Sequence, residues 1–380
     1  IDKIRLGNQS NLDDDQKNNK ARNTYFFFPF ILGIIGLLYS YNRDLKTFWT
    51  LLLLFLFTGL ALKFYLNERP FEPRERDYAL VGSFYVFSIW IGFGMSSILK
   101  FFSELKNKYL NFGLFFLCLI SVPGLMAFVN WDDHDRSDRY TAQSIARSYL
   151  QSIQKDKDAM IFTIGDNDTF ALWYVQEIEE FRTDVRTINT SLLATDWYID
   201  QMKRRAYISS PIPSQMEHKN YAYGVRDYIR YENLLDTVRW DINNFMDWVS
   251  SDHPRTKYRN LITQSGGDVS NYPINSLETV FYPTNKIRVP VNIDNVIKSG
   301  IVNERDIDLI VPYIDIDLPK SVLTKNQIMM LDILANNNWE RPIYFTGGSY
   351  ADSEYIWMKE YLQLDGLVYK LVPIRTEMDK

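Results

Sequence analysis

Four long apolar stretches in the first third of the chain restrict its fold more than any other feature. They cover residues 25–41, 48–66, 79–99 and 109–129, and Lys63 is the only Asp, Glu, Lys or Arg among them. A hydrocarbon layer about 30 Å thick needs about 20 apolar residues in a helix, since a helix satisfies its own backbone groups. Buried helices of a soluble core are the alternative. Four such runs so close together favour transmembrane helices.

The charge balance divides the chain in two. Residues 1–130 contain 14 Lys or Arg and 10 Asp or Glu, whereas residues 131–380 contain 28 and 37, so +4 and −9 add up to the total of −5. We therefore predict a polar stretch at 1–24, a membrane segment at 25–130 and an acidic water-soluble domain at 131–380. This balance argues against nucleic acid as a partner. The chain starts with a polar stretch and without Met, so we expect it to be a piece of a longer chain.

The pattern of the second part predicts an α/β domain. A short apolar run at 159–165, a polar turn at 166–170, a helical stretch at 171–181 and a second strand at 185–193 form a βαβ unit. Further elements are expected as a helix at 325–335, a strand at 342–346, a helix around 355–362 and a strand at 367–374. The Pro- and Asn-rich residues between, about 211–319, suggest an insertion of hairpins and loops. The fold class is thus a membrane α-helical segment followed by a three-layer α/β domain with a β-rich insertion.

Polar side chains follow both strands of the βαβ unit. Asp166, Asn167 and Asp168 come after the first strand, and Asp196 and Trp197 come after the second. Ligands of open parallel sheets bind beyond the carboxyl ends of the strands. The first group fits a tight turn and helix cap, or a site for a polar ligand or a divalent cation at which both carboxylates point. Asp196 is also expected to cap a helix at 197–207, and Trp197 either stacks on a sugar or belongs to the core.

A second acidic cluster follows the fourth apolar stretch. It consists of Asp132, Asp133, His134, Asp135 and Asp138, with Arg136 and Arg139 between them. Three interpretations are open: a metal or sugar site at the membrane surface, a salt-bridged collar that positions the domain, and a solvated linker. The interleaved arginines favour the collar, and a lone histidine near charges is usually structural.

Six short motifs in a fixed order resemble one family. They lie at 72–78 (EPRERDY), 82–85 (GSFY), 130–136 (NWDDHDR), 165–170 (GDNDTF), 195–200 (TDWYID) and 338–344 (NWERPIY). Together they are similar to a bacterial multi-pass membrane family described as a domain of unknown function and related to animal protein O-mannosyltransferases that act on plexin-type receptors. The resemblance covers about residues 65–350.

This resemblance implies a glycosyltransferase of the GT-C type in the bacterial inner membrane. Such enzymes use a polyprenyl-phosphate sugar donor on the extracytoplasmic face, so the soluble domain would be periplasmic and would bind or position donor or a protein or glycan acceptor. The cation count of the loops mildly favours a cytoplasmic domain, and we give the resemblance precedence. The family's acidic catalytic residue lies in an early extracytoplasmic loop that no motif here matches, so no catalytic residue is assigned.

Two other functions remain open. One is a non-catalytic membrane scaffold or a subunit that binds glycan or protein through the loop-rich insertion. The other is metal-dependent hydrolysis at the two acidic clusters.

Overall fold

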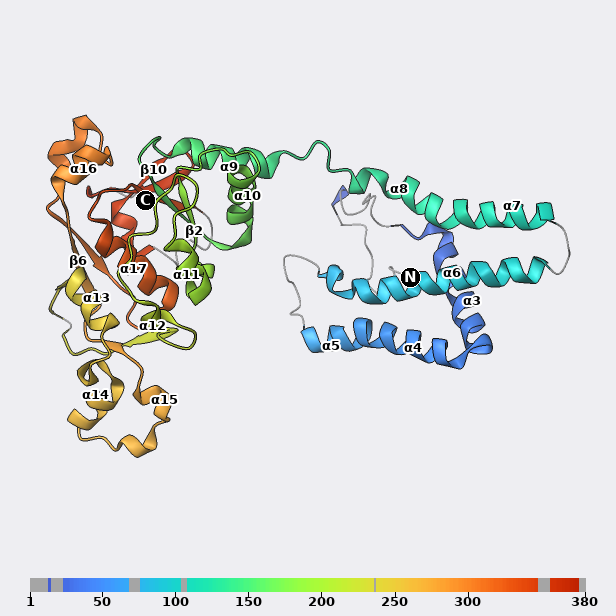
Figure 1. The fold of residues 1–380 in the computed structure, drawn as a ribbon, viewed down its shortest axis with the longest axis horizontal. Helices are drawn as coiled ribbons and strands as arrows, with labels where there is room; N and C mark the ends of the chain where they lie inside the picture. The colour runs from blue at the N-terminus through green and yellow to red at the C-terminus, as the bar shows by residue number, and fades with distance from the viewer. Residues whose placement is uncertain are drawn as a thin grey trace. The chain divides into compact units, whose positions relative to one another are not determined.

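The computed structural model describes residues 13–14, 23–67, 76–103, 108–235, 237–347 and 356–375. The chain folds into two compact units, Ile1–Asp138 and Arg139–Lys380, whose helices and strands are drawn in Figure 1. The units are described separately below.

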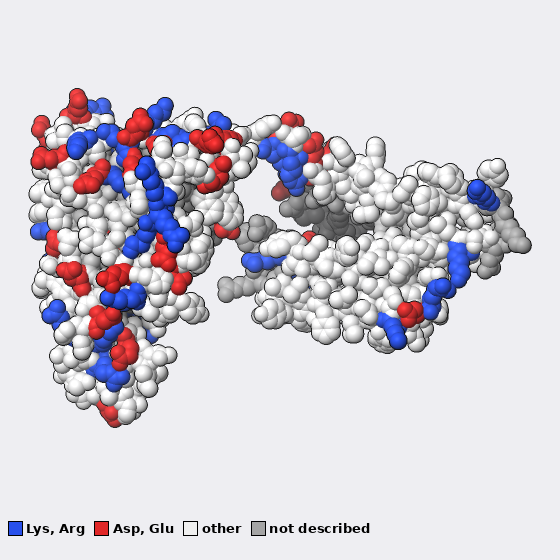
Figure 2. Space-filling model, in the orientation of Figure 1, with Lys and Arg blue, Asp and Glu red and all other residues white. Residues whose placement is uncertain are grey.

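The first unit contains four helices that are long and apolar enough to cross a membrane, as predicted. They span Tyr25–Arg43, Leu45–Leu66, Asp77–Ser103 and Lys108–His134. On the face drawn in Figure 2, few charged residues lie along the helices between their ends. Between the first two, Asp44 adopts an extended backbone and caps the second, because its carboxylate accepts hydrogen bonds from Lys46 N at 3.0 Å and Thr47 Oγ1 at 2.6 Å.

Regular α-helix and short π-helical segments alternate within these spans. The α-helices are α3 (Phe28–Arg43), α4 (Leu45–Leu56), α5 (Leu62–Leu66), α6 (Val81–Ser103), α7 (Lys108–Leu119) and α8 (Leu125–His134). Phe57–Ala61 joins α4 to α5, and Ile120–Gly124 joins α7 to α8. Pro123 lies in the second of these segments, where its missing N–H interrupts the α-helical ladder.

Glycines bring α3 and α6 into backbone contact. A Cβ at Gly36 would lie 1.7 Å from the Trp90 carbonyl oxygen, and a Cβ at Gly94 would lie 2.1 Å from the Leu32 carbonyl oxygen. Both distances are far below van der Waals contact, so only glycine fits. Small residues at helix interfaces are how membrane helices approach closely, since lipid provides no hydrophobic drive for their association.

Gly94→Ala is therefore expected to destabilise the helical unit by about 1–3 kcal/mol, because the added methyl group forces α3 and α6 apart. Gly92→Ala is the matched control, since a Cβ at Gly92 meets nothing within 4 Å and alanine favours a helix by up to about 1 kcal/mol. Thermal unfolding of the full chain in detergent should show a lower melting temperature for Gly94→Ala only. Equal shifts in both variants would contradict the close α3–α6 contact.

A five-stranded sheet forms the centre of the second unit. Its strands are β1 (Met160–Thr163), β2 (Arg186–Asn189), β9 (Ile343–Thr346), β10 (Leu362–Asp365) and β11 (Val368–Leu371), in the order β10-β11-β9-β1-β2. β1 pairs in parallel with β2 and with β9, whereas β11 runs antiparallel to β9 and β10. The strands of the predicted βαβ unit are thus neighbours, and a strand from the far end of the chain completes the parallel part.

Alternating side chains of β1 build a core on each face of this sheet. Met160 and Phe162 belong to one core, and Ile161 belongs to the other, as the period of two in a strand requires. Helices α9 (Thr141–Ser152) and α10 (Gly165–Glu177) pack on the Ile161 face, and α11 (Asp196–Met202) and α17 (Lys325–Asn337) pack on the opposite face. The three-layer α/β domain is therefore confirmed.

The segment 211–319, together with the strand that follows it at Val322–Thr324, adds small sheets and short helices. One sheet has the order β5-β3-β8 and the other β4-β6-β7. The strands are β3 (Tyr228–Tyr231), β4 (Trp240–Asp241), β5 (Phe281–Tyr282), β6 (Lys286–Pro290), β7 (Tyr313–Asp317) and β8 (Val322–Thr324). The helices are α12 (His218–Tyr221), α13 (Ile242–Ser250), α14 (Tyr258–Gln264), α15 (Ile274–Leu277) and α16 (Ile293–Ser299).

Some predicted boundaries differ from the structure. The residues 166–170, predicted as a polar turn, form the first turns of α10. The helix expected around 355–362 is a 3-10 helix, Ile356–Tyr361, and Leu362 already begins β10. The helix expected at 197–207 ends at Met202.

Candidate functional site

The carboxyl ends of β1, β2 and β9 lie together at one edge of the sheet. Their last residues are Thr163, Asn189 and Thr346, which are all buried. This edge is where open parallel sheets bind ligands. We define these strand ends, with the first turn of α10 and the segment between β2 and α11, as the candidate site.

Hydrogen bonds between neutral side chains fix the candidate site. The hydroxyls of Thr163 and Thr169 lie 2.6 Å apart, and Asn189 Nδ2 donates to Thr169 Oγ1 at 2.8 Å and to the Gly165 carbonyl at 3.2 Å. Gly165 has a φ of +69°, which glycine adopts at little cost, so α10 can begin one residue after Ile164. The chain after β1 is thereby tied to the end of β2.

Asp168 is the half-buried carboxylate of this site. Burial raises its pKa above the ordinary value, and the Thr346 hydroxyl lowers it in part. This hydroxyl is itself buried and has no hydrogen bond of normal geometry within the described residues. Burial and the Asp168 carboxylate together raise the pKa of Tyr149 on α9. Asp168 is thus a partly desolvated acceptor beside the Thr346 hydroxyl, and such an acceptor suits recognition of another hydroxyl.

Asp166 and Asn167 do not join Asp168 around one point. Both are exposed, whereas Asp168 is half-buried. Because the segment is helical, Asp166 and Asp168 are two positions and about 200° apart around the helix axis. The expected convergence of the two carboxylates depended on a turn, and the helix removes it.

Asp196 and Trp197 lie in the first turn of α11. The Asp196 carboxylate accepts from Trp197 N at 2.7 Å and from Tyr223 N at 3.1 Å, while Thr195 is the residue that precedes the helix. Trp197 has 55% of its surface exposed and remains free to stack on a ligand. The neighbouring Tyr198 is buried, and its hydroxyl accepts from Asn189 N at 2.9 Å, so it belongs to the core.

The acidic cluster after the fourth apolar stretch belongs to the first unit. Asp132, Asp133 and His134 form the last turn of α8, so the helix extends beyond the apolar run. His134 Nδ1 lies 3.0 Å from the Asn130 carbonyl, and Arg136 donates to the Asp133 carbonyl at 3.1 Å. Asp135 accepts from Ser137 N at 2.9 Å. These bonds cap the end of a helix.

Within the described residues, no group of three or more His, Cys, Asp or Glu side chains is arranged to hold a metal ion. A divalent cation at the acidic residues stays a prediction.

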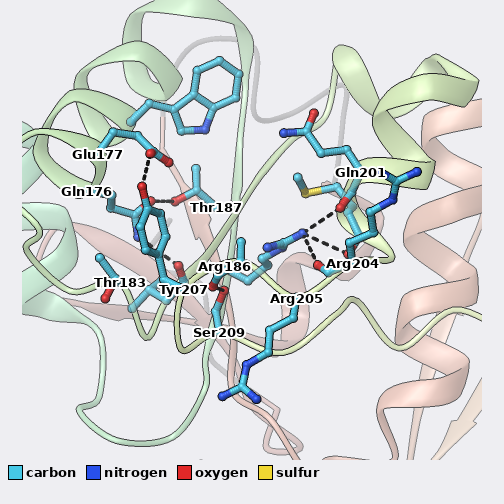
Figure 3. Close-up of a pocket in the computed structure, with 14 residues that line it drawn as sticks. Gln176, Glu177, Thr183, Arg186, Thr187, Gln201, Arg204, Arg205, Tyr207 and Ser209 are labelled. Carbon is cyan, nitrogen blue, oxygen red and sulfur yellow. Dashed lines mark hydrogen bonds between the residues drawn. The ribbon is translucent and has the colours of Figure 1, made fainter.

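A cavity of about 540 Å³ lies beside β2, between α10 and the chain after α11. Arg186 lies at the inner wall of this cavity. Its guanidinium Nη2 donates hydrogen bonds to the carbonyls of Gln201, Met202 and Arg204 at 2.9–3.1 Å. Figure 3 shows this guanidinium directed at those carbonyls, and it shows the side chains of Arg204 and Arg205 extending in different directions. Arg186 thus holds the end of α11 on the sheet, and the arginines do not converge on one small anion.

Sequence reasoning missed Tyr149 and Thr346. Thr346 is the last residue of a correctly predicted strand, so the rule about carboxyl ends would have indicated it once β9 was known to neighbour β1. Tyr149 follows the apolar period of α9, and no local pattern indicates its electrostatic interaction with Asp168.

Asp168→Asn is expected to raise the melting temperature of the full chain at pH 7 by about 1–3 °C. The folded-state pKa of Asp168 lies above its unfolded value, so ionisation costs stability as pH rises through the folded pKa. The gain should therefore shrink as pH falls through the folded-state pKa, and it should vanish below the unfolded value of about 3.9, where both states are protonated. Asp166→Asn is the control, since it also removes an acid from the first turn of α10 but from an exposed position. A gain independent of pH, or equal in the control, would contradict the desolvation of Asp168.

The fold and site define a protein with four apolar helices and a three-layer α/β domain that has a polar, hydroxyl-rich sheet edge. Residues 142–380, which are 239 of the 380, match the family model TMEM260-associated domain 2. The chain belongs to this family, which is associated with a protein related to O-mannosyltransferases. No curated protein and no solved structure matches the chain.

Proposed function

We propose that this chain is part of a membrane-embedded glycosyltransferase of the GT-C type, which transfers a sugar from a polyprenyl-phosphate donor. Mannose is the sugar that we propose first. The proposal places the chain in a bacterial inner membrane with its second unit in the periplasm. The observation that carries it is the family match over residues 142–380 in a chain with four apolar helices. A donor with a lipid tail needs an enzyme in the bilayer, and these helices supply that location.

In this proposal the second unit binds donor or acceptor at the candidate site. Asp168 accepts a hydrogen bond from a substrate hydroxyl, and the buried side chain of Thr346 lies beside the carboxylate. Asp196 and the exposed ring of Trp197 follow β2 at the same edge and supply a second acceptor and a stacking surface. Substrate binding by Asp132, Asp133, His134 and Asp135 stays a prediction.

Sugar transfer in cells tests this role of Asp168. A strain that lacks the complete gene is complemented with wild-type protein or with a variant, and the mannose on its envelope proteins is measured by mass spectrometry. Asp168→Asn should lower transfer about 10–100-fold, because a hydrogen bond to a charged acceptor contributes about 1.5–3 kcal/mol. The variant is expected to be at least as stable as the parent, so unfolding does not explain a loss.

Asp294→Asn is the matched control for the cell experiment. Asp294 is an exposed acid in the first turn of α16 and lies outside the candidate site. Normal transfer in both variants would overturn the binding role of Asp168 and would favour a scaffold function for the second unit.

A further inference from the structure

An exposed apolar stripe runs along α10. Phe170, Tyr174 and Ile178 have 55%, 49% and 69% of their surface exposed, and their spacing of four places them on one side of the helix. The other side, with Thr169, Leu172, Val175 and Gln176, is buried. A helix on a water-exposed surface normally carries polar residues at such positions. Three large apolar side chains in a row therefore indicate a surface that contacts something other than water.

The stripe continues into the segment after α11. Tyr207 and Ile208 are 55% and 62% exposed, and the Tyr207 hydroxyl donates a hydrogen bond to Glu177 on the same side of α10 (Figure 3). Trp173 and Tyr207 also line one cavity. We call Phe170, Tyr174, Ile178, Tyr207 and Ile208 the apolar face of the second unit.

Two exposed cations and the exposed carboxylate of Glu177 border the apolar face. Arg204 and Arg205 lie three and two residues before Tyr207 in the chain and line the same cavity as Trp173. Their side chains extend in different directions (Figure 3), which suits several separate anions spread over a surface better than one phosphate held at a point. Tyr, Trp and Phe side chains beside Arg are typical of protein surfaces in the headgroup region of a bilayer.

The covalent connection keeps this part of the chain near a membrane. Helix α8 ends the last apolar span at His134 and α9 begins at Thr141, so six residues separate them. A fully extended segment of this length reaches about 20 Å. Ala146 and Leu150 of α9 share a core with Leu172 and Val175 of α10, so α10 moves with a helix whose start stays close to the end of a transmembrane span.

We propose that the apolar face, with Arg204 and Arg205, rests in the headgroup region of a bilayer that contains anionic lipid. The aromatic and aliphatic side chains enter the boundary between headgroups and acyl chains, and the two guanidinium groups contact lipid phosphates. The contact fixes how the second unit is turned toward the lipid, where a substrate with a lipid tail would be presented. It does not depend on sugar transfer.

Spin-label accessibility in nanodiscs tests this contact on the full chain. Cys118, the only cysteine, is replaced by Ser, and a spin label is attached to Tyr174→Cys or, as the control, to Leu309→Cys, which replaces a residue that is 59% exposed in the insertion. Discs contain either neutral lipid or one-third anionic lipid. Relaxation of each label by oxygen, which concentrates in lipid, and by a water-soluble nickel chelate is measured.

With anionic discs, the label at position 174 should be at least about three times more accessible to oxygen than to nickel, and the label at 309 should show the reverse. Arg204→Glu with Arg205→Glu should reduce this ratio at position 174 several-fold, since each Arg near an anionic surface contributes about five-fold to binding. Nickel accessibility at 174 equal to that at 309 would overturn the proposal. Protection from both reagents would overturn it too, because a protein would then cover the face.

Discussion

Arg226→Ala is expected to lower the free energy of unfolding of the second unit by about 3–5 kcal/mol. The side chain of Arg226 is only 3% exposed. Its guanidinium donates to the carbonyls of Val249, Ser250 and Ser251 at 2.7, 3.0 and 3.1 Å. These carbonyls belong to the end of α13, where no further helical N–H is available to them. Alanine leaves the three carbonyls without their hydrogen-bond donor in a buried part of the second unit.

Thermal unfolding of the full chain in detergent, followed by circular dichroism, should show a drop of about 10 °C for Arg226→Ala. Arg226→Lys should lie between, because a single ammonium nitrogen lacks the spread of the guanidinium, whose Nε and Nη2 reach the three carbonyls from different positions. Arg255→Ala is the control: Arg255 is exposed and stacks over Trp248 at 5.7 Å, so its loss should cost about 0.5 kcal/mol. A drop of the same size in Arg255→Ala, or none in Arg226→Ala, would show that this helix end does not need the guanidinium.

Phe162→Ala is expected to cost about 3–5 kcal/mol and to leave much of the second unit unfolded at 37 °C. Phe162 lies in β1, an interior strand of the sheet, is 1% exposed, and stacks on Phe345 of β9 with ring centroids 5.3 Å apart. Its removal leaves a cavity between the two strands that carry Thr163 and Thr346. The sheet edge that forms the candidate site depends on this pairing.

Phe170→Ala serves as the control for Phe162→Ala, because Phe170 is the same residue type at 55% exposure on α10. Its substitution should change the free energy of unfolding by less than about 0.5 kcal/mol. Urea unfolding of the full chain in detergent, monitored by tryptophan fluorescence, separates the two. If Phe170→Ala proved as destabilising as Phe162→Ala, the packing described for β1 and β9 would be wrong.

The transmembrane helices could be predicted from the sequence because length and hydrophobicity are local properties. The end of α8 could not, because hydropathy marks where lipid ends and not where the helix ends. Asp132 to His134 continue the helix beyond the apolar run, whereas 135–138 lie beyond the end of the helix. The collar and the linker both stay predictions.

The candidate site was predicted in part. The sequence predicted the two strands that precede Asp168 and Asp196. Because ligands bind at the carboxyl ends of parallel strands, these strands indicated the edge of the sheet at which the candidate site lies. The local conformation was ambiguous, because Asp and Asn favour both turns and first turns of helices, and Gly165 allowed α10 to begin at once. The neighbourhood of Asp168 and Thr346 arises from pairing between β1 and β9, which are about 180 residues apart, and no local pattern reports such a pairing.

Direct sugar transfer tests the central proposal. The complete protein that contains this chain is purified into nanodiscs and supplied with radiolabelled polyprenyl-phosphate mannose and a candidate acceptor protein. We expect label to move to the acceptor, and we expect Asp168→Asn to lower kcat/KM about 10–100-fold while Asp294→Asn leaves it unchanged. A folded wild-type protein that binds the acceptor but transfers no label from any polyprenyl-phosphate sugar would contradict it.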